Sequence, residues 1–78
     1  MNKTYVSFFH VDDKQHPIFS HDNMPIVPNI GEVVYHQNEK GEATAYEVME
    51  RNIFLFSDKD GHKDVLIRFY VRRAGFVD

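Results

Sequence analysis

The chain has 78 residues, of which 42% are hydrophobic, and a formal net charge of −3, so we expect one domain spanning residues 1–78 and not a general polyanion binder, which is normally basic. It contains no cysteine, which excludes disulfides, thiolate metal sites and cysteine nucleophiles, and argues against secretion of so small a domain. No apolar run approaches the roughly 20 residues of a membrane-spanning helix, and the first residues do not resemble a signal peptide, which predicts a cytoplasmic protein without membrane contact.

The first predicted strand covers residues 4–11. Val6 and Phe8 lie on one face of this strand, and Tyr5 and Phe9 lie on the other, because successive side chains alternate across a strand. Large apolar side chains on both faces indicate a strand that is covered from both sides.

Residues 12–29 are predicted to form a long proline-containing loop. Pro17, Pro25 and Pro28 lie in it, and each proline biases the preceding residue toward extended conformations and lacks the N–H that a central strand needs. Loops of this length in compact domains often carry function, so this loop is one candidate binding surface.

A strand beginning at Gly31, a turn at residues 38–41 and a returning strand at residues 43–49 are predicted next. The returning segment also fits a helix at about residues 42–52. Apolar residues recur there at helical spacing: Ala45, Met49, Ile53 and Phe56. We favour the strand, because β-branched and aromatic residues alternate with the others.

The last 20 residues of regular pattern, 53–72, are predicted to form a β-hairpin. Residues 65–72 alternate strictly between apolar and mixed side chains, with Ile67 and Phe69 on the core face. Residues 57–64 contain the Asp and Gly typical of a turn. The predicted fold class is therefore mainly β, a small antiparallel sheet of four or five strands, with an α+β fold as the alternative.

Part of the chain resembles small SH3-like β-barrels. The run PNIGEVV at residues 28–34 is similar to the P-x-x-G-E/D-x-V entry into a strand of such barrels, and YEV at residues 46–48 is similar to their returning strand. The resemblance covers about residues 28–72 and implies a small barrel. Such barrels bind peptides, RNA, DNA or nothing, so it implies no particular function and no binding residue.

The last predicted strand carries the candidate partner-binding residues. Arg68, Tyr70 and Arg72 share one of its faces, and Arg73 follows. Arginine binds carboxylates and phosphates, and tyrosine is common in interfaces. Three interpretations are open: a protein interface, a nucleic-acid contact, or a solvated face whose arginines pair with acidic residues across the strands, namely Glu47, Glu50 or Asp58.

Histidines in the early loop are weak metal-ligand candidates. His10, His16 and His21 are interspersed with aspartates, and both residue types bind zinc or iron. Their spacing matches no established metal motif, so we assign no metal. The run Asp58–Gly61 indicates a hairpin turn, because an EF-hand calcium loop has its glycine at the sixth position.

The sequence predicts no enzyme and no cofactor, because no sound set of nucleophile, base and orienting group is present. The predicted function is a non-catalytic protein-binding module, such as a small inhibitor or adaptor of the kind that phages encode. The predicted partner is another protein, and a homodimer is a further option, since so small a core gains stability from association. RNA or DNA binding through the arginine face is the first alternative, and metal binding by the histidine loop is the second.

Overall fold

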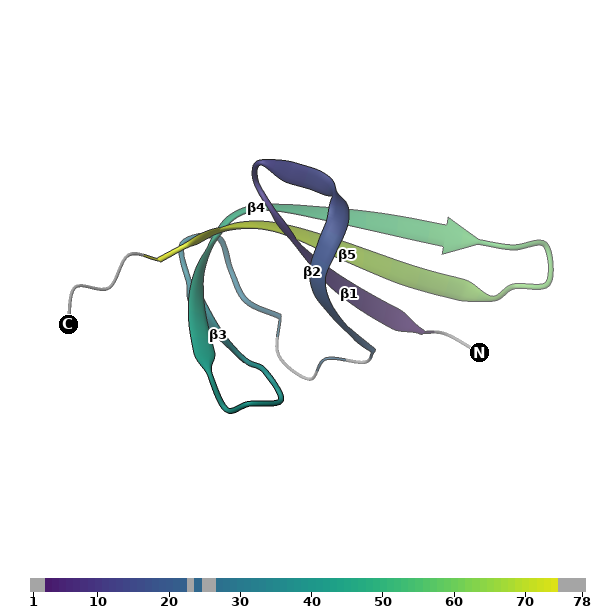
Figure 1. The fold of residues 1–78 in the computed structure, drawn as a ribbon. Coiled ribbons are helices and arrows are strands. Elements are labelled where there is room, and N and C mark those ends of the chain that lie inside the picture. The colour runs from purple at the N-terminus through teal and green to yellow at the C-terminus, as the bar shows by residue number, and fades with distance from the viewer. Residues whose placement is uncertain (1–2, 23, 25–26, 75–78) are drawn as a thin grey trace.

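The computed structural model describes residues 3–22, 24 and 27–74. In this part of the chain a single five-stranded sheet forms, in the order β2-β1-β5-β4-β3 (Figure 1). The strands are β1 (Thr4–His10), β2 (Asp13–Asp22), β3 (Val33–Gln37), β4 (Ala43–Ser57) and β5 (Lys63–Arg73). The prediction of a mainly β fold is confirmed.

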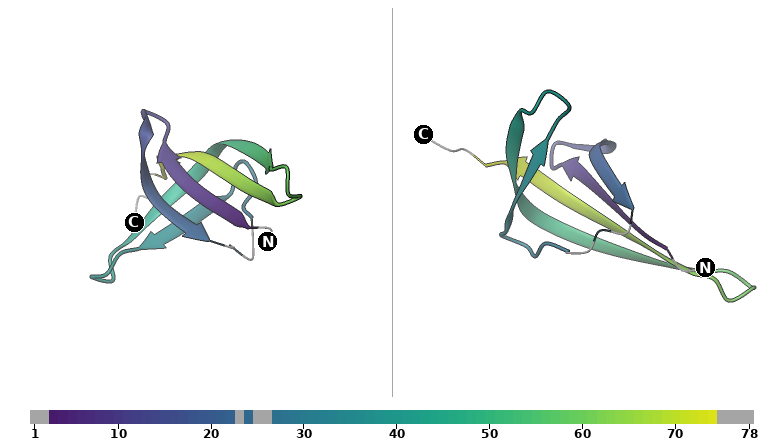
Figure 2. Two further views of the ribbon diagram at one scale, coloured as in Figure 1. Left: turned by 90° about the vertical axis from the view of Figure 1, so that its right-hand side faces the viewer. Right: turned by 90° about the horizontal axis from the view of Figure 1, so that it is seen from below.

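The sheet is mixed and open, which corrects the expected antiparallel barrel. β1 and β5 run parallel, whereas the other neighbouring strands are antiparallel. No short loop joins β1 to β5, so their relative direction is not imposed by a hairpin. The sheet curls into a half-barrel (Figure 2) whose edge strands, β2 and β3, do not pair with each other.

The inner face of the curled sheet holds the core. Val6, Phe8, Val48, Ile67, Phe69 and Val71 form one buried cluster there. Four rings extend this cluster from the centre of the sheet to its far edge. Phe69 stacks on Phe8 with ring centroids 4.9 Å apart, Phe8 stacks on Phe19 at 4.4 Å, and Phe19 stacks on His36 at 4.1 Å. Because Phe19 belongs to β2 and His36 to β3, side chains connect the two open edges.

The predicted loop at residues 12–29 is wrong over its first half, because β2 occupies Asp13–Asp22. Pro17 is tolerated since β2 is an edge strand and needs no ladder hydrogen bond on its outer side. Pro17 lies opposite Phe9, where the register of the β1–β2 pair is irregular. Pro25 lies outside the described residues.

The helix considered at residues 42–52 is also wrong, because β4 runs unbroken from Ala43 to Ser57. It joins the predicted strand at residues 43–49 to the predicted hairpin strand. A bulge between Val48 and Glu50 accommodates Met49 as an extra residue opposite β5. Pairing with β3 on one side and β5 on the other outweighs the helical preference of its Ala, Glu and Met residues.

The loops of the β3–β4 and β4–β5 hairpins share one local design. The side chains of Asn38 and Asp58 each accept hydrogen bonds from the backbone N–H groups two and four residues later, at 2.9–3.0 Å. Gly41 and Gly61 then adopt φ values of 82° and 85°, which L side chains disfavour. This Asx-x-x-Gly pattern is readable in the sequence, and the predicted turns at both places are confirmed.

Candidate functional site

β4 and β5 extend past the curled body as a two-stranded arm, defined here as residues 53–66. Figure 1 shows it projecting from one end of the molecule. The arm is a regular antiparallel ladder in which Phe54 lies opposite Leu66, and Leu55 opposite Val65. On the β5 side, the N-terminal part of β1 runs alongside, beginning at Thr4 opposite Val65. On the β4 side, β3 pairs only as far as Glu47.

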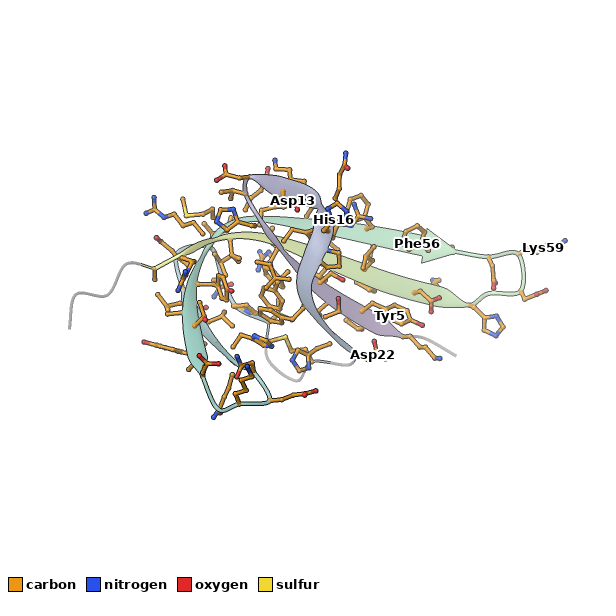
Figure 3. The ribbon with its side chains drawn as sticks, viewed as in Figure 1. Tyr5, Asp13, His16, Asp22, Phe56 and Lys59 are labelled. Carbon is orange, nitrogen blue, oxygen red and sulfur yellow. The ribbon has the colours of Figure 1, made fainter. Side chains whose placement is uncertain are left out.

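Four consecutive large apolar side chains of β4 are exposed on the arm. The exposed fractions are 54% for Ile53, 38% for Phe54, 76% for Leu55 and 53% for Phe56. Since neighbouring residues of a strand point to opposite faces, both faces of the arm present apolar surface. Figure 3 shows Phe56 standing out from the arm and Lys59 at its tip, apart from the side chains that fill the body. A group of exposed large apolar side chains of this kind is typical of an interaction site.

The tip of the arm is held by the Asp58 carboxylate. Its Oδ1 accepts hydrogen bonds from the backbone N–H groups of Asp60 and His62, both at 2.9 Å, and its Oδ2 lies 3.0 Å from Nδ1 of the His62 ring. The hydrogen bond from the His62 backbone is the main cause that holds the pKa of Asp58 below its ordinary value of 3.8. The charged form of Asp58 therefore stabilises the hairpin loop that closes the arm.

This carboxylate makes the arm sensitive to acid. A carboxyl whose pKa is lowered by folding contributes stability that is present above its ordinary pKa and is lost as the pH falls through the folded pKa. We expect a carbon-13 NMR titration of Asp58 to have its midpoint below 3.8. Asp58→Ala should destabilise the protein at neutral pH, and the difference from wild type should fade as the pH falls below 3.8 and through the lowered pKa of Asp58. Asp58→Asn assigns the resonance by removing it; a midpoint at or above 3.8 contradicts the expectation.

Three of the predicted partner-binding residues, Arg68, Tyr70 and Arg72, lie on the outer face of β5, and all three are engaged within the protein. Tyr70 is only 6% exposed and packs against Phe9 with ring centroids 5.8 Å apart. The Lys14 ammonium lies 4.8 Å from the centre of the Tyr70 ring. The Arg68 guanidinium lies 5.6 Å from the ring centre of Phe9 and 5.1 Å from that of Phe54. These cation–π contacts cover an aromatic row that otherwise would face solvent.

The two remaining arginines, Arg72 and Arg73, lie on opposite faces of β5, because side chains alternate along a strand. Arg72 shares the outer face and binds Glu47, with its Nη2 2.8 Å and its Nε 3.0 Å from the same carboxylate oxygen. Arg73 lies opposite Tyr46, which packs against the core, and is therefore on the other face. The four predicted residues thus do not form one basic patch, and the predicted cross-strand pair with Glu47 is confirmed.

The three weak metal candidates do not come together. His10 contacts Asp12, with Nδ1 3.6 Å from a carboxylate oxygen, and His16 contacts Asp13 at 3.2 Å. His21 lies edge-on to Phe19. Within residues 3–22, 24 and 27–74, the one group whose ligand atoms are close enough to share an ion is Asp58, Asp60 and His62. All three are exposed, and Asp58 and His62 already serve the loop at the tip of the arm.

Sequence reasoning placed Ile53–Phe56 in the first strand of a hairpin but did not identify the run as an exposed surface. The run itself contains a pattern that indicates two apolar faces. Four consecutive apolar residues give a strand two apolar faces, whereas the adjacent β5 alternates and has only one. What the run does not reveal is whether other strands cover those faces.

Nothing in the described part of the chain forms a helix long and apolar enough to cross a membrane. The chain was compared with protein-family models, with curated proteins and with solved structures, and none of the three comparisons returned a match.

Proposed function

We propose that this protein is a non-catalytic protein-binding module that contacts its partner through the arm. The exposure of Ile53, Phe54, Leu55 and Phe56 on a projecting hairpin carries this proposal. Leaving such side chains in water forgoes about 1.5–3 kcal/mol for each one that could be fully buried. Their burial against another protein recovers part of this free energy, which is the usual source of affinity at an apolar interface.

Arg68 lies beside the same apolar surface and is a second argument for an interface there. Its guanidinium stacks on Phe54 at the base of the arm, so an apolar patch is bordered by a cation that is already oriented. Aromatic residues and arginine at the centre of an interface often carry most of the binding energy. Of the predicted partner-binding residues, Arg68 is therefore the one that we assign to the interface.

The arm has almost no net charge of its own. Residues 53–66 carry three acidic side chains and two basic ones besides His62. Binding to it is therefore governed by apolar contact and not by a strong field of one sign. This balance fits a protein partner better than a nucleic acid, whose binding depends on several cationic contacts.

The wider role that we propose is that of a cytoplasmic adaptor or inhibitor. In this proposal the fold is an open variant of an SH3-like barrel. The curled sheet of five strands supports this, and so does the strand–turn–strand unit formed by β3 and the first half of β4. The body serves as a scaffold that holds the arm away from the core, and no catalytic step is assigned to any residue.

The experiment that tests this function compares two exposed aliphatic residues. Immobilised wild-type protein captures binding proteins from extracts of the source cells, and each captured protein is purified and measured directly by calorimetry. We expect Leu55→Ser to weaken binding at least about tenfold, as loss of a well-packed interface residue does. Ile30→Ser is the matched control, because Ile30 is 61% exposed but lies outside the arm. Equal affinities for wild type and Leu55→Ser would contradict the proposal.

A further inference from the structure

The outer edge of β4 along the arm offers free backbone groups. The N–H of Val65 donates to the carbonyl of Lys3 at 2.8 Å, so the Val65 amide points toward β1 and away from β4. Val65 lies opposite Leu55, and in an antiparallel ladder the two members of a pair that lacks mutual hydrogen bonds both point outward. Leu55 therefore directs its N–H and C=O away from β5, and by alternation Ile53 does the same.

No strand of the described chain occupies this edge. The last backbone contacts on the outer side of β4 are at Val48, whose N–H donates to Glu32 and whose carbonyl accepts from Gly31. Beyond the bulge at Met49, residues 51–57 of β4 have β5 on one side, and none of residues 3–22, 24 or 27–74 pairs with them on the other. An extended edge with apolar side chains on both faces favours addition of a further strand.

We propose that this edge pairs with the same edge of a second copy of the chain. The proposal rests on the proposed function, because it names one occupant of the same arm. The two copies of β4 would run antiparallel about a twofold axis that passes between the two Phe54 residues. Ile53 then lies opposite Leu55 of the second copy, and Phe54 opposite Phe54 of the second copy. The two arms become one four-stranded sheet.

The register follows from the alternation of the strand. A twofold axis perpendicular to a sheet pairs residues of the same face, so only every second register is allowed. Centring on Phe54 pairs the seven residues 51–57 up to the end of β4 at Ser57. It also brings the two outward-pointing residues Ile53 and Leu55 together as a hydrogen-bonded pair. Centring on Leu55 would run into the loop after five residues.

The area and charge of the arm fit a weak symmetric dimer. At about 200 Å² for each fully exposed side chain, the four residues expose on the order of 400 Å² of apolar surface per copy. Two copies would bury at most roughly 800 Å² besides the backbone, which is below the size of stable specific interfaces and fits a weak association. The nearly neutral arm creates no strong repulsion between copies, although each chain carries a net charge of −3.

Analytical ultracentrifugation of the full chain tests the proposal. Wild-type protein should change from monomer to dimer between about 5 and 500 μM. Leu55→Pro should remain monomeric, because it removes an outward-pointing N–H and leaves the ladder to β5 intact. Ile53→Lys is the second variant, which places a charge at the contact between the two β4 strands. Tyr35→Lys is the control, since Tyr35 is 66% exposed on β3, away from the arm, and should dimerise like wild type.

NMR gives an independent measurement on the same samples. On dilution of the wild-type protein, amide shifts should change in residues 51–57, and the amides of Ile53 and Leu55 should be protected from exchange only at high concentration. Wild-type protein that stays monomeric at 500 μM overturns the dimer, and so does a dimer that both arm variants leave intact. Neither result affects the proposed function, which fails only if Leu55→Ser binds a purified partner as wild type does.

Discussion

Replacing Phe8 with alanine is expected to remove most of the stability of the protein. Phe8 is fully buried and lies between two rings, Phe19 at 4.4 Å and Phe69 at 4.9 Å. Truncating a buried phenylalanine costs about 3–5 kcal/mol through lost transfer free energy and the cavity that remains. The whole stability of a domain of this size is only about 5 kcal/mol, so the substitution removes most of it.

Urea denaturation followed by circular dichroism measures this loss. Ile30→Ala is the control, because Ile30 is 61% exposed and its truncation should change the free energy of unfolding by less than about 0.5 kcal/mol. A Phe8→Ala protein with a urea midpoint near that of wild type would show that the stacked rings are not the centre of the core.

Replacing Phe19 with alanine is expected to separate the two edges of the curled sheet. Phe19 belongs to β2, yet its ring stacks on His36 of β3 at 4.1 Å with an interplanar angle of 7°. β2 and β3 share no hydrogen-bonded ladder, so this contact and the packing around it hold the half-barrel curled. Because Phe19 is only partly buried, we expect a loss of about 2–3 kcal/mol, or a fall in Tm of roughly 10–20 °C.

Hydrogen exchange distinguishes this effect from general destabilisation. Amides of β2 and β3 should exchange faster in Phe19→Ala, whereas those of β4 and β5 should keep more of their protection. His21→Ala is the control, because His21 is exposed and touches Phe19 only edge-on at 6.2 Å. Equal losses in Phe19→Ala and His21→Ala would contradict the role assigned to the stacked pair.

The arm and the core are separate in this protein, which makes binding and folding separable by mutation. The residues that stabilise the body lie on its inner face, where Val6, Phe8, Val48, Phe69 and Val71 are fully buried. The residues assigned to binding are exposed and lie on the extension of β4 past the point where β3 ends. Substitutions such as Leu55→Ser should therefore change affinity with little change in the free energy of unfolding.

The sequence by itself determined the local structure of most of the chain. The alternation at residues 65–72 predicted β5 and its core face, and Ile67, Phe69 and Val71 are indeed buried. The double-faced pattern of residues 4–11 predicted a strand covered on both sides, and Val6, Phe8 and Phe9 are all buried. Turn chemistry at Asn38–Gly41 and Asp58–Gly61 located the loops of the β3–β4 and β4–β5 hairpins, because Asx side chains and glycine act within a few residues of themselves.

Only the tertiary structure decided which apolar residues are covered. Ile53–Phe56 and the buried part of β5 look alike in composition, but β3 ends before it reaches the former. The parallel pairing of β1 with β5, the strand in place of the predicted loop at residues 13–22, and the burial of Tyr70 under Lys14 all depend on segments distant in sequence. Burial is a property of neighbours in space, and periodicity along the chain describes only the two faces of a strand, not what lies against them.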